Sequence, residues 1–246
     1  QVIDRIPTVF SISQAVHDSL LKDYGVNSIV VNNGIIVSNF KKRLVRTKSP
    51  ICKIVQVGRL DHSDKGQDLT IQAIAKLAKQ GISVSATFIG DGQSLEFLKQ
   101  LAEENRISDN IFFIGKRSQA FVSEHICDYD IFVQPSRFEG FGLTVAEAMA
   151  AGVPVIVAND QGPAEVTKDN TYGWTFLNGD QNDFAEKIEF VINHYKDACT
   201  KANAGLKYVA EIYDVSITAK KYLEKYGTKT KVISGKESLI HNLCSY

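Results

Sequence analysis

Cysteine is scarce in this sequence, and the few cysteines present lack the spacing of a metal site. The chain of 246 residues contains four, none in a Cys-x-x-Cys arrangement (Cys52, Cys127, Cys199 and Cys244). This pattern favours reduced, structural thiols over disulfides or a zinc site.

The sequence also lacks an excess of charge of either sign and any long apolar run. It has 28 basic and 28 acidic residues, so the formal net charge is zero. A neutral chain is a poor match for nucleic acid, and we expect none as a partner. No apolar run reaches the roughly 20 residues of a membrane span. We therefore expect a cytoplasmic location, with peripheral attachment at the membrane surface as a further expectation.

Short apolar, β-rich runs are plentiful, and amphipathic stretches separate most of them. Apolar residues make up 44% of the chain, enough for a sizeable core. Continuous apolar strands that alternate with helices predict a parallel sheet covered on both faces, an α/β Rossmann-like doubly wound fold. The predicted strands are SIVVNN, CKIVQVG, VSATFIG, NIFFIG, DIFVQP, VPVIVAN and YGWTFL. The predicted helices are QDLTIQAIAKLAKQG, QSLEFLKQLAEEN, SQAFVSEHICD, LTVAEAMAAG, DFAEKIEFVINHYKDA and one within DVSITAKKYLEKYG.

The ends of the chain differ from its centre. Residues 1–40 hold a strand, a helix and a strand, too little to bury a core of their own. Residues 41–50 are basic and end in proline, as in an exposed linker. We expect the main domain over residues 51–212, a C-terminal helix over 213–226 and a loosely ordered tail over 227–246. Because the chain starts with Gln and not Met, we expect it to come from a longer gene product.

The predicted site lies where the strands end. In an open parallel sheet, ligands bind outside the carboxyl ends of the strands, so each strand-to-helix turn is a candidate. Four of these turns combine glycine with charged residues. In chain order they hold Gly58, Arg59 and Lys65; Gly90; Gly115, Lys116 and Arg117; and Glu139 and Glu147 within SRFEGFGLTVAEAMAAG, residues 136–152.

The last turn has the features of a phosphate site. Gly140 and Gly142 can adopt positive φ and let the backbone approach a ligand closely. The unpaired N–H groups of a helix that begins near Leu143 attract a phosphate. Arg59 and Lys65 would add charge-assisted hydrogen bonds to a diphosphate.

The two glutamates require a different partner, because a carboxylate repels phosphate. Vicinal hydroxyls suit Glu139 and Glu147, since an ionised carboxylate accepts hydrogen bonds strongly. The helix separates the two carboxylates, so one would meet a ribose and the other a sugar. The ligand predicted in this way is a nucleoside diphosphate sugar.

Each element also has an ordinary structural interpretation. The segment GDGQSL has two of the three glycines of a dinucleotide fingerprint and is weak evidence for NAD. Arg59 and Lys65 could each be surface charges. Glu147 could lie on a solvated helix face, although a carboxylate without a binding partner would cost free energy among its small and apolar neighbours. His62 and His125 are scattered, and we expect neither to be catalytic.

These motifs, taken together and in order, resemble retaining glycosyltransferases, especially glycosyltransferase family 4. The resemblance covers residues 28 to about 226 and implies the C-terminal, donor-binding half of the two-domain GT-B fold. The segments that carry it are IVVNNGI, VGRLDHSDKGQDLTIQAI, FIGDG, IFFIGKR, DIFVQPSRFEGFGLTVAEAMAAGVPVIVAND, GPAEV and YGWTF. One position departs from the family pattern: Ile36 stands where an acidic residue is usual.

The resemblance also implies roles for residues. Arg59 and Lys65 match cations that bind the diphosphate and stabilise the leaving group, and Glu139 matches a glutamate beside the donor sugar. These three are the expected catalytic residues. Glu147 matches the glutamate on the ribose. The loop of Gly140, Phe141, Gly142 and Leu143 matches backbone that approaches sugar and phosphate, and the turn of Gly115, Lys116 and Arg117 matches the one that contacts the base.

Further implications concern cofactors, acceptors and activity. The family works without NAD and usually without a bound metal, so we expect no cofactor and no metal. The expected enzyme is a hexosyltransferase of polysaccharide or glycoconjugate synthesis, with a nucleotide donor such as a UDP sugar. Its glycan or lipid-linked acceptor would bind through an N-terminal domain, of which residues 1–40 would be only a remnant and the crossover, so the isolated chain should be inactive. Two alternatives are a nucleotide-sugar-binding or regulatory module without transfer activity and a GT-B-fold epimerase.

Overall fold

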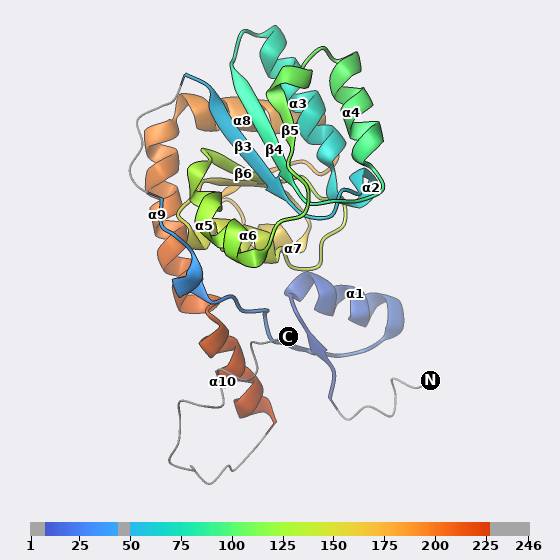
Figure 1. The fold of residues 1–246 in the computed structure, drawn as a ribbon. Helices are drawn as coiled ribbons and strands as arrows, with labels where there is room; N and C mark the ends of the chain where they lie inside the picture. The colour runs from blue at the N-terminus through green and yellow to red at the C-terminus, as the bar shows by residue number, and fades with distance from the viewer. Residues whose placement is uncertain (1–7, 44–49, 227–246) are drawn as a thin grey trace.

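A six-stranded parallel sheet forms the centre of the molecule in a computed structural model, which describes residues 8–43 and 50–226 (Figure 1). The strand order is β5-β4-β3-β6-β7-β8. Every residue of β6 and β7 is buried, as expected for strands covered on both faces. The strands are β3 Cys52–Val57, β4 Val84–Ile89, β5 Ile111–Phe113, β6 Ile131–Gln134, β7 Val155–Ala158 and β8 Trp174–Phe176.

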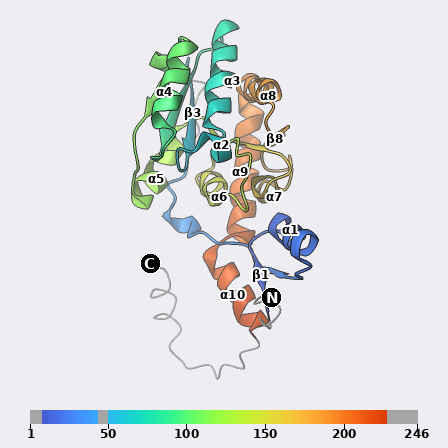
Figure 2. The same ribbon diagram turned by 90° about the vertical axis from the view of Figure 1, so that its right-hand side faces the viewer.

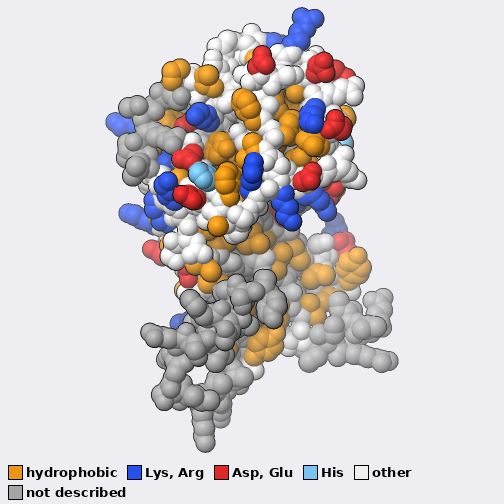
Figure 3. Space-filling model, in the orientation of Figure 1, with side chains coloured by type: hydrophobic (Ala, Val, Ile, Leu, Met, Phe, Trp, Pro, Cys, Tyr) orange, Lys and Arg blue, Asp and Glu red, His pale blue; other side chains and the backbone are white. Residues whose placement is uncertain are grey.

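Helices cover both faces of this sheet and enclose two hydrophobic clusters. One face carries α3 Gln67–Lys79, α4 Leu95–Glu104 and α8 Gln181–Asn193. The other carries α5 Gln119–His125, α6 Leu143–Ala150 and α9 Tyr195–Ile212. The predicted α/β, Rossmann-like doubly wound fold is confirmed. On the surface shown in Figure 3, acidic and basic side chains are interspersed, as a net charge of zero suggests.

The strand order determines where a ligand can bind. From β3 the chain adds β4 and β5 on one side of the sheet, then returns to place β6, β7 and β8 on the other. The direction reverses between β3 and β6, which pair through Ile54–Ile131 and Val55–Phe132. Such a reversal leaves a crevice at the carboxyl ends of the two central strands.

The C-terminal helices differ from the prediction. Instead of one helix over DFAEKIEFVINHYKDA, α8 ends at Asn193 and α9 starts at Tyr195, with His194 between them. The chain turns there because α8 packs against α3 whereas α9 packs against α6 on the opposite face. Gly205 of α9 lies close to α6, where an added Cβ would come within 3.1 Å of Met149 Cε. The short helices α2 His62–Lys65 and α7 Gly162–Val166 were not predicted either.

The N-terminal segment forms a small layer below the large domain (Figure 2). It consists of β1 Phe10–Ser11, α1 Gln14–Tyr24 and β2 Ile29–Val30, and β1 and β2 form a separate parallel pair. Helix α10, Val215–Lys225, packs on this layer through Phe10, whose ring centroid lies 5.0 Å from that of Tyr222. The predicted C-terminal helix therefore exists, and it joins the N-terminal segment.

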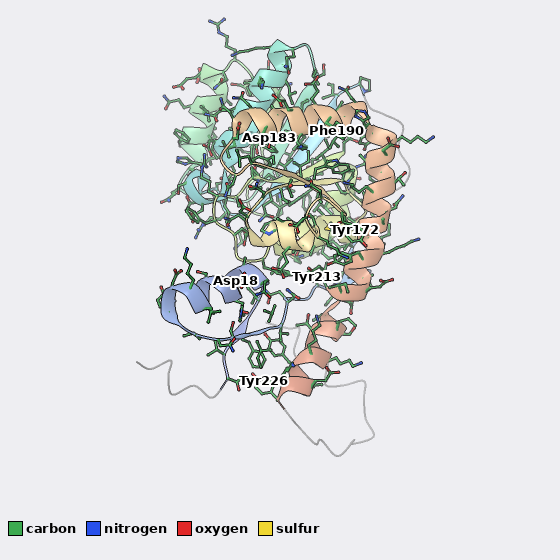
Figure 4. All side chains as sticks on the ribbon, turned by 180° about the vertical axis from the view of Figure 1, so that it is seen from behind. Asp18, Tyr172, Asp183, Phe190, Tyr213 and Tyr226 are labelled. Carbon is green, nitrogen blue, oxygen red and sulfur yellow. The ribbon has the colours of Figure 1, made fainter. Side chains whose placement is uncertain are left out.

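Residues between these layers are tightly held. Tyr213, where α9 passes into α10, is buried and lies at the lower edge of the large domain, to the side of α1 (Figure 4). Its backbone carbonyl accepts a hydrogen bond from Ile35 N at 2.8 Å. Short 3-10 helices complete the chain at Val37–Asn39, Ser108–Asn110 and Ile126–Asp128.

The predicted linker is only partly an exposed segment. Lys41 and Lys42 are exposed, but the Arg43 side chain is 4% exposed and its Nη2 lies 2.7 Å from Asp130 Oδ1. Tyr195 also hydrogen-bonds to both of these side chains. The buried carboxylate of Asp130, next to the start of β6, therefore fixes Arg43, near the beginning of this basic run. Residues 44–49 and the predicted tail over 227–246 lie outside the described residues.

Candidate functional site

Two adjoining cavities open at the carboxyl edge of the sheet, and Leu143 lines both. The first, of about 370 Å³, lies at the crevice between β3 and β6. The second, of about 520 Å³, lies on the other side of the start of α6. The first is lined by Ile12, Asn33, Gln56, Val57, Gly58, Lys65, Gln134, Ser136, Glu139, Phe141, Gly142, Leu143 and Thr144. The second is lined by Gly34, Ile35, Ile36, Asn39, Phe40, Gln119, Ala120, Ser123, Leu143 and Glu147.

Lys65 and Glu139 meet in the first cavity. Lys65 Nζ lies 2.7 Å from Glu139 Oε2, and Gln134 Nε2 donates to the same oxygen at 2.9 Å. Lys65 is the last residue of α2, and Gly66 follows with φ 66°. A Cβ at Gly66 would collide with the carbonyl of Pro135, so glycine allows the lysine-bearing turn to pack against the end of β6. The structure thus brings together two of the three predicted catalytic residues.

The glycine loop, defined here as residues 139–142, leads directly into α6. Gly142 precedes the helix with φ 92°, a conformation that favours glycine. Gly140, in contrast, does not have the predicted positive φ. Its lack of a side chain serves close packing instead, since a Cβ there would lie 3.3 Å from Val16 Cγ2. The first-turn amides of α6, which have no partner within the helix, start beside both cavities.

Glu147 lies one helical turn further on, in the second cavity. It is 8% exposed, and its Oε1 accepts a hydrogen bond from Gln119 Nε2 at 2.7 Å. Burial raises the pKa of the Glu147 carboxyl to about 7, and the hydrogen bond from Gln119 opposes this shift. The solvated-face interpretation of Glu147 is therefore wrong.

Other predicted cations lie away from the cavities. The Arg59 side chain is 63% exposed, and its Nη2 lies 3.6 Å from Asp61 and 3.4 Å from Asp64. Arg117 stacks over the Phe121 ring, with its guanidinium carbon 5.4 Å from the ring centroid. Lys116 is exposed as well. In this structure, none of these three lines either cavity.

Of the remaining predicted glycines, which follow β3, β4 and β5, Gly90 has a packing role. Gly58 lines the first cavity. Gly90 N donates to Gly115 O at 3.0 Å, and a Cβ at Gly90 would collide with the carbonyl of Gly58. The missing side chain of Gly90 therefore lets the turn after β4 lie against the turn after β3, whereas a Cβ on Gly58 or Gly115 would meet nothing within 4 Å.

Sequence reasoning missed several buried amides. Gln56 is the penultimate residue of β3 and Gln134 the last of β6, and both are buried. Gln56 Nε2 donates to Lys65 O at 2.8 Å, and Gln134 Oε1 accepts from Thr144 Oγ1 at 2.8 Å. The available signal was a polar residue near the end of an otherwise apolar strand.

Nothing in the described part of the chain forms a metal site: residues 8–43 and 50–226 contain no group of three or more His, Cys, Asp or Glu side chains that could hold an ion. An Asp-x-Asp sequence occurs at Asp128–Asp130, but it precedes β6 and so lies at the opposite edge of the sheet. Among the same residues, no helix combines the length and the apolar character needed to cross a membrane.

Solved structures share this architecture. HepE from Anabaena, described in complex with UDP and glucose, superposes with a TM-score of 0.80 at 21% identity, over 90% of this chain and 63% of that one. Sucrose-phosphate synthase from Thermosynechococcus elongatus gives a TM-score of 0.80 at 19% identity, over 92% of this chain and 59% of that one. The fold is thus the Rossmann-like half of a GT-B glycosyltransferase.

The family follows from the sequence. Residues 38–205 match the family described as Glycosyl transferases group 1, and the chain belongs to it. A similar curated protein is the phosphatidylinositol N-acetylglucosaminyltransferase gpi3 subunit of Schizosaccharomyces pombe, 27% identical over 75% of this chain and 40% of that protein. Another is the poly(ribitol-phosphate) alpha-N-acetylglucosaminyltransferase of Staphylococcus aureus, 23% identical over 92% of this chain and 45% of that protein. The chain thus spans less than half the length of these two relatives.

Proposed function

We propose that this chain is the donor-binding domain of a retaining hexosyltransferase that moves a sugar from a nucleoside diphosphate sugar to an acceptor hydroxyl. The observation that carries the proposal is the division of the site by the start of α6. One cavity holds Lys65 and Glu139, the other holds Glu147, and Leu143 lies between them. A ligand with a sugar, a diphosphate and a ribose in that order matches this division.

Each polar group of the site suits the part of the donor that would lie beside it. The first amides of α6 would bind the diphosphate, and Lys65 would balance the negative charge that grows on it as the bond to the sugar breaks. Glu139 would accept from sugar hydroxyls. Glu147 lies about 6 Å along the helix from Leu143, a distance suited to the ribose. The acceptor oxygen then bonds to the sugar carbon that the diphosphate leaves, and the proton of the acceptor hydroxyl passes to the departing diphosphate.

The comparisons support a nucleotide donor without identifying it. HepE is described with UDP and glucose and with UDP-glucose, and a structure of Staphylococcus aureus TarM is described with UDP. We propose a UDP sugar as the donor to test first. Consistent with the resemblance to family 4, we propose that the reaction needs no metal and no cofactor, and that a glycan or lipid-linked acceptor binds through a domain outside this chain.

A calorimetric screen tests the proposal. The 246-residue chain is titrated with UDP, GDP and ADP and with a sugar conjugate of each. We expect one nucleotide and its conjugates to bind and the other two to bind at least tenfold more weakly. Failure of all three nucleotides to bind would contradict the proposed function.

A second measurement separates binding from transfer. Orientation of the acceptor contributes several kcal/mol to lowering the barrier, and this chain offers only one side of the cleft. We therefore expect the 246 residues to bind the donor without robust transfer to added acceptors. Efficient transfer by this chain alone would contradict the expectation that a further domain is required.

A further inference from the structure

The turn between β1 and α1 lies directly against the glycine loop of the candidate site. Ser13 Oγ donates a hydrogen bond of 2.5 Å to Gly140 O, across 127 positions of the sequence, and Ser13 is fully buried. Ile12 lines the same cavity as Lys65 and Glu139. The N-terminal segment therefore contributes to the site and does not merely lie below it (Figure 1).

The peptide group between Gly140 and Phe141 is held in one orientation. Ser13 donates a hydrogen bond to the carbonyl oxygen of this peptide group. Gly162 packs against the same peptide group, so closely that a Cβ on Gly162 would collide with Gly140 and with Phe141 N. Gly162 N also donates to the preceding carbonyl, Glu139 O, at 2.9 Å. Because a trans peptide directs its C=O and N–H in opposite directions, fixing the carbonyl on Ser13 turns the Phe141 N–H away from Ser13.

Ser13 is itself fixed in place. Its Oγ accepts from Val16 N at 3.1 Å as the N-cap of α1. The next residue, Gln14, donates its backbone N–H to Glu165 Oε2 at 2.8 Å, and Asn32 Nδ2 donates to the other oxygen of Glu165 at 3.2 Å. The carboxylate of α7 thus ties the β1–α1 turn to the large domain, so the hydroxyl of Ser13 cannot easily leave the glycine loop.

We propose that Ser13 is a positioning residue for donor binding: its hydroxyl orients the peptide after Gly140 and so aims the backbone N–H groups of the glycine loop at the diphosphate. This inference rests on the proposed function and adds to it a residue outside the family match over 38–205. Without the hydroxyl, the peptide can rotate and present a carbonyl oxygen, which repels phosphate.

The test compares three variants at Ser13 with a matched control. Ser13→Ala removes both hydrogen bonds, Ser13→Gly removes the bond to Gly140 but leaves an acceptable N-cap, and Ser13→Thr keeps the hydroxyl. Ser11→Ala is the control, because Ser11 is buried at the end of β1, two residues before Ser13, and its Oγ has no hydrogen-bond partner. Each protein is titrated with UDP and with uridine, and its fold is checked by circular dichroism.

We expect Ser13→Ala and Ser13→Gly to bind UDP about tenfold more weakly and to bind uridine like the wild type. Ser13→Thr should recover most of the UDP affinity, and Ser11→Ala should change neither ligand. Equal UDP affinity in all variants, or equal losses for UDP and uridine, would overturn the inference. A wild type that binds no nucleotide would instead contradict the proposed function.

A measurement on the wild type alone keeps the inference testable even if a variant fails to fold. Hydrogen exchange of the amides over residues 139–143 is followed with UDP and with uridine. We expect UDP to protect these amides at least fivefold more than uridine does. Equal protection by the two ligands would overturn the assignment of the loop, and of Ser13, to the diphosphate.

Discussion

Lys65 and Glu139 form an ion pair within the first cavity: Nζ lies 2.7 Å from Oε2, and the side chains are 24% and 22% exposed. A lysine held by a carboxylate is less available to a phosphate than a lysine without one. The pair therefore acts on the two ends of the donor in opposite ways. Glu139 weakens the attraction of Lys65 for the diphosphate, while it offers hydrogen-bond acceptors to the sugar.

Substituting Glu139 separates these two effects. In Glu139→Gln, Lys65 loses its charged partner, so the affinity for UDP should stay equal or increase by up to about 1 kcal/mol, the range of a partly exposed ion pair. The affinity for UDP-glucose should decrease relative to UDP, because the sugar loses a charged acceptor. Calorimetric titration of both ligands measures the difference. A clear loss of UDP affinity would show that Glu139 does not contact the sugar end.

The two predicted cations should now behave differently. Lys65→Ala should weaken UDP binding by roughly 1.5–3 kcal/mol, the size of a hydrogen bond to a charged group. Arg59→Ala should cost less than about 1 kcal/mol, since Arg59 is largely exposed and lies beside Asp61 and Asp64. Lys53→Ala is a suitable control, because Lys53 is exposed on β3 near the opposite edge of the sheet. Equal losses for Lys65 and Arg59 would mean that Arg59 turns into the cavity when the ligand binds.

Glu147 should make stability depend on pH. Its pKa is raised from 4.5 to about 7 by burial, so the unfolded chain loses this proton at lower pH than the folded chain. Stability is therefore lost as the pH rises from about 4.5 through 7, by up to about 3 kcal/mol. Glu147→Gln lacks this titration. Relative to the wild type, the variant should gain stability between pH 5 and pH 8, as measured by urea unfolding.

Donor binding should couple to the same carboxyl group. If the ribose hydroxyls donate to Glu147, binding favours the ionised form and releases a proton near pH 7. The affinity for UDP should then rise from pH 6 to pH 8 more steeply in the wild type than in Glu147→Gln. Calorimetry in two buffers of different ionisation enthalpy counts the protons. Identical pH profiles for the two proteins would place the ribose away from Glu147.

The sheet and most helices could be predicted because their patterns are local. A continuous, short apolar run such as Ile131–Val133 is typical of a strand buried between two layers. Helix α9 was missed beyond residue 198 because Asn203 and Gly205 weaken its pattern, whereas the structure needs a small residue there against Met149. The break at His194 comes from packing on opposite faces, which no local pattern records.

The sequence predicted which residues belong to the site better than it predicted how their side chains are arranged. The turns containing Lys65 and Glu139 do meet, because parallel strands place their carboxyl ends on one edge, and Glu147 lies on the helix that follows, in the adjoining cavity. The exposed position of Arg59 depends on two neighbouring aspartates, and the bond between Ser13 and Gly140 joins residues far apart in sequence. Contacts of this kind depend on how separate layers pack, and they leave no periodic signal.

Gly142 should be the least replaceable residue of the glycine loop. It has φ 92°, and a Cβ there would lie 2.9 Å from Pro163 Cγ, a ring atom with little freedom to move. Gly142→Ala therefore combines backbone strain with a steric clash and should reduce the free energy of unfolding by roughly 2–4 kcal/mol.

Gly179→Ala is the matched control, because Gly179 has φ 82° but nothing within 4 Å of an added Cβ. The control should lose only about 1–2 kcal/mol, the strain alone. Urea unfolding of both variants gives the difference, and titration with UDP shows whether the displaced start of α6 also weakens binding. Equal stability of the two variants would mean that Pro163 moves aside without cost, and that the loop is less rigid than its packing suggests.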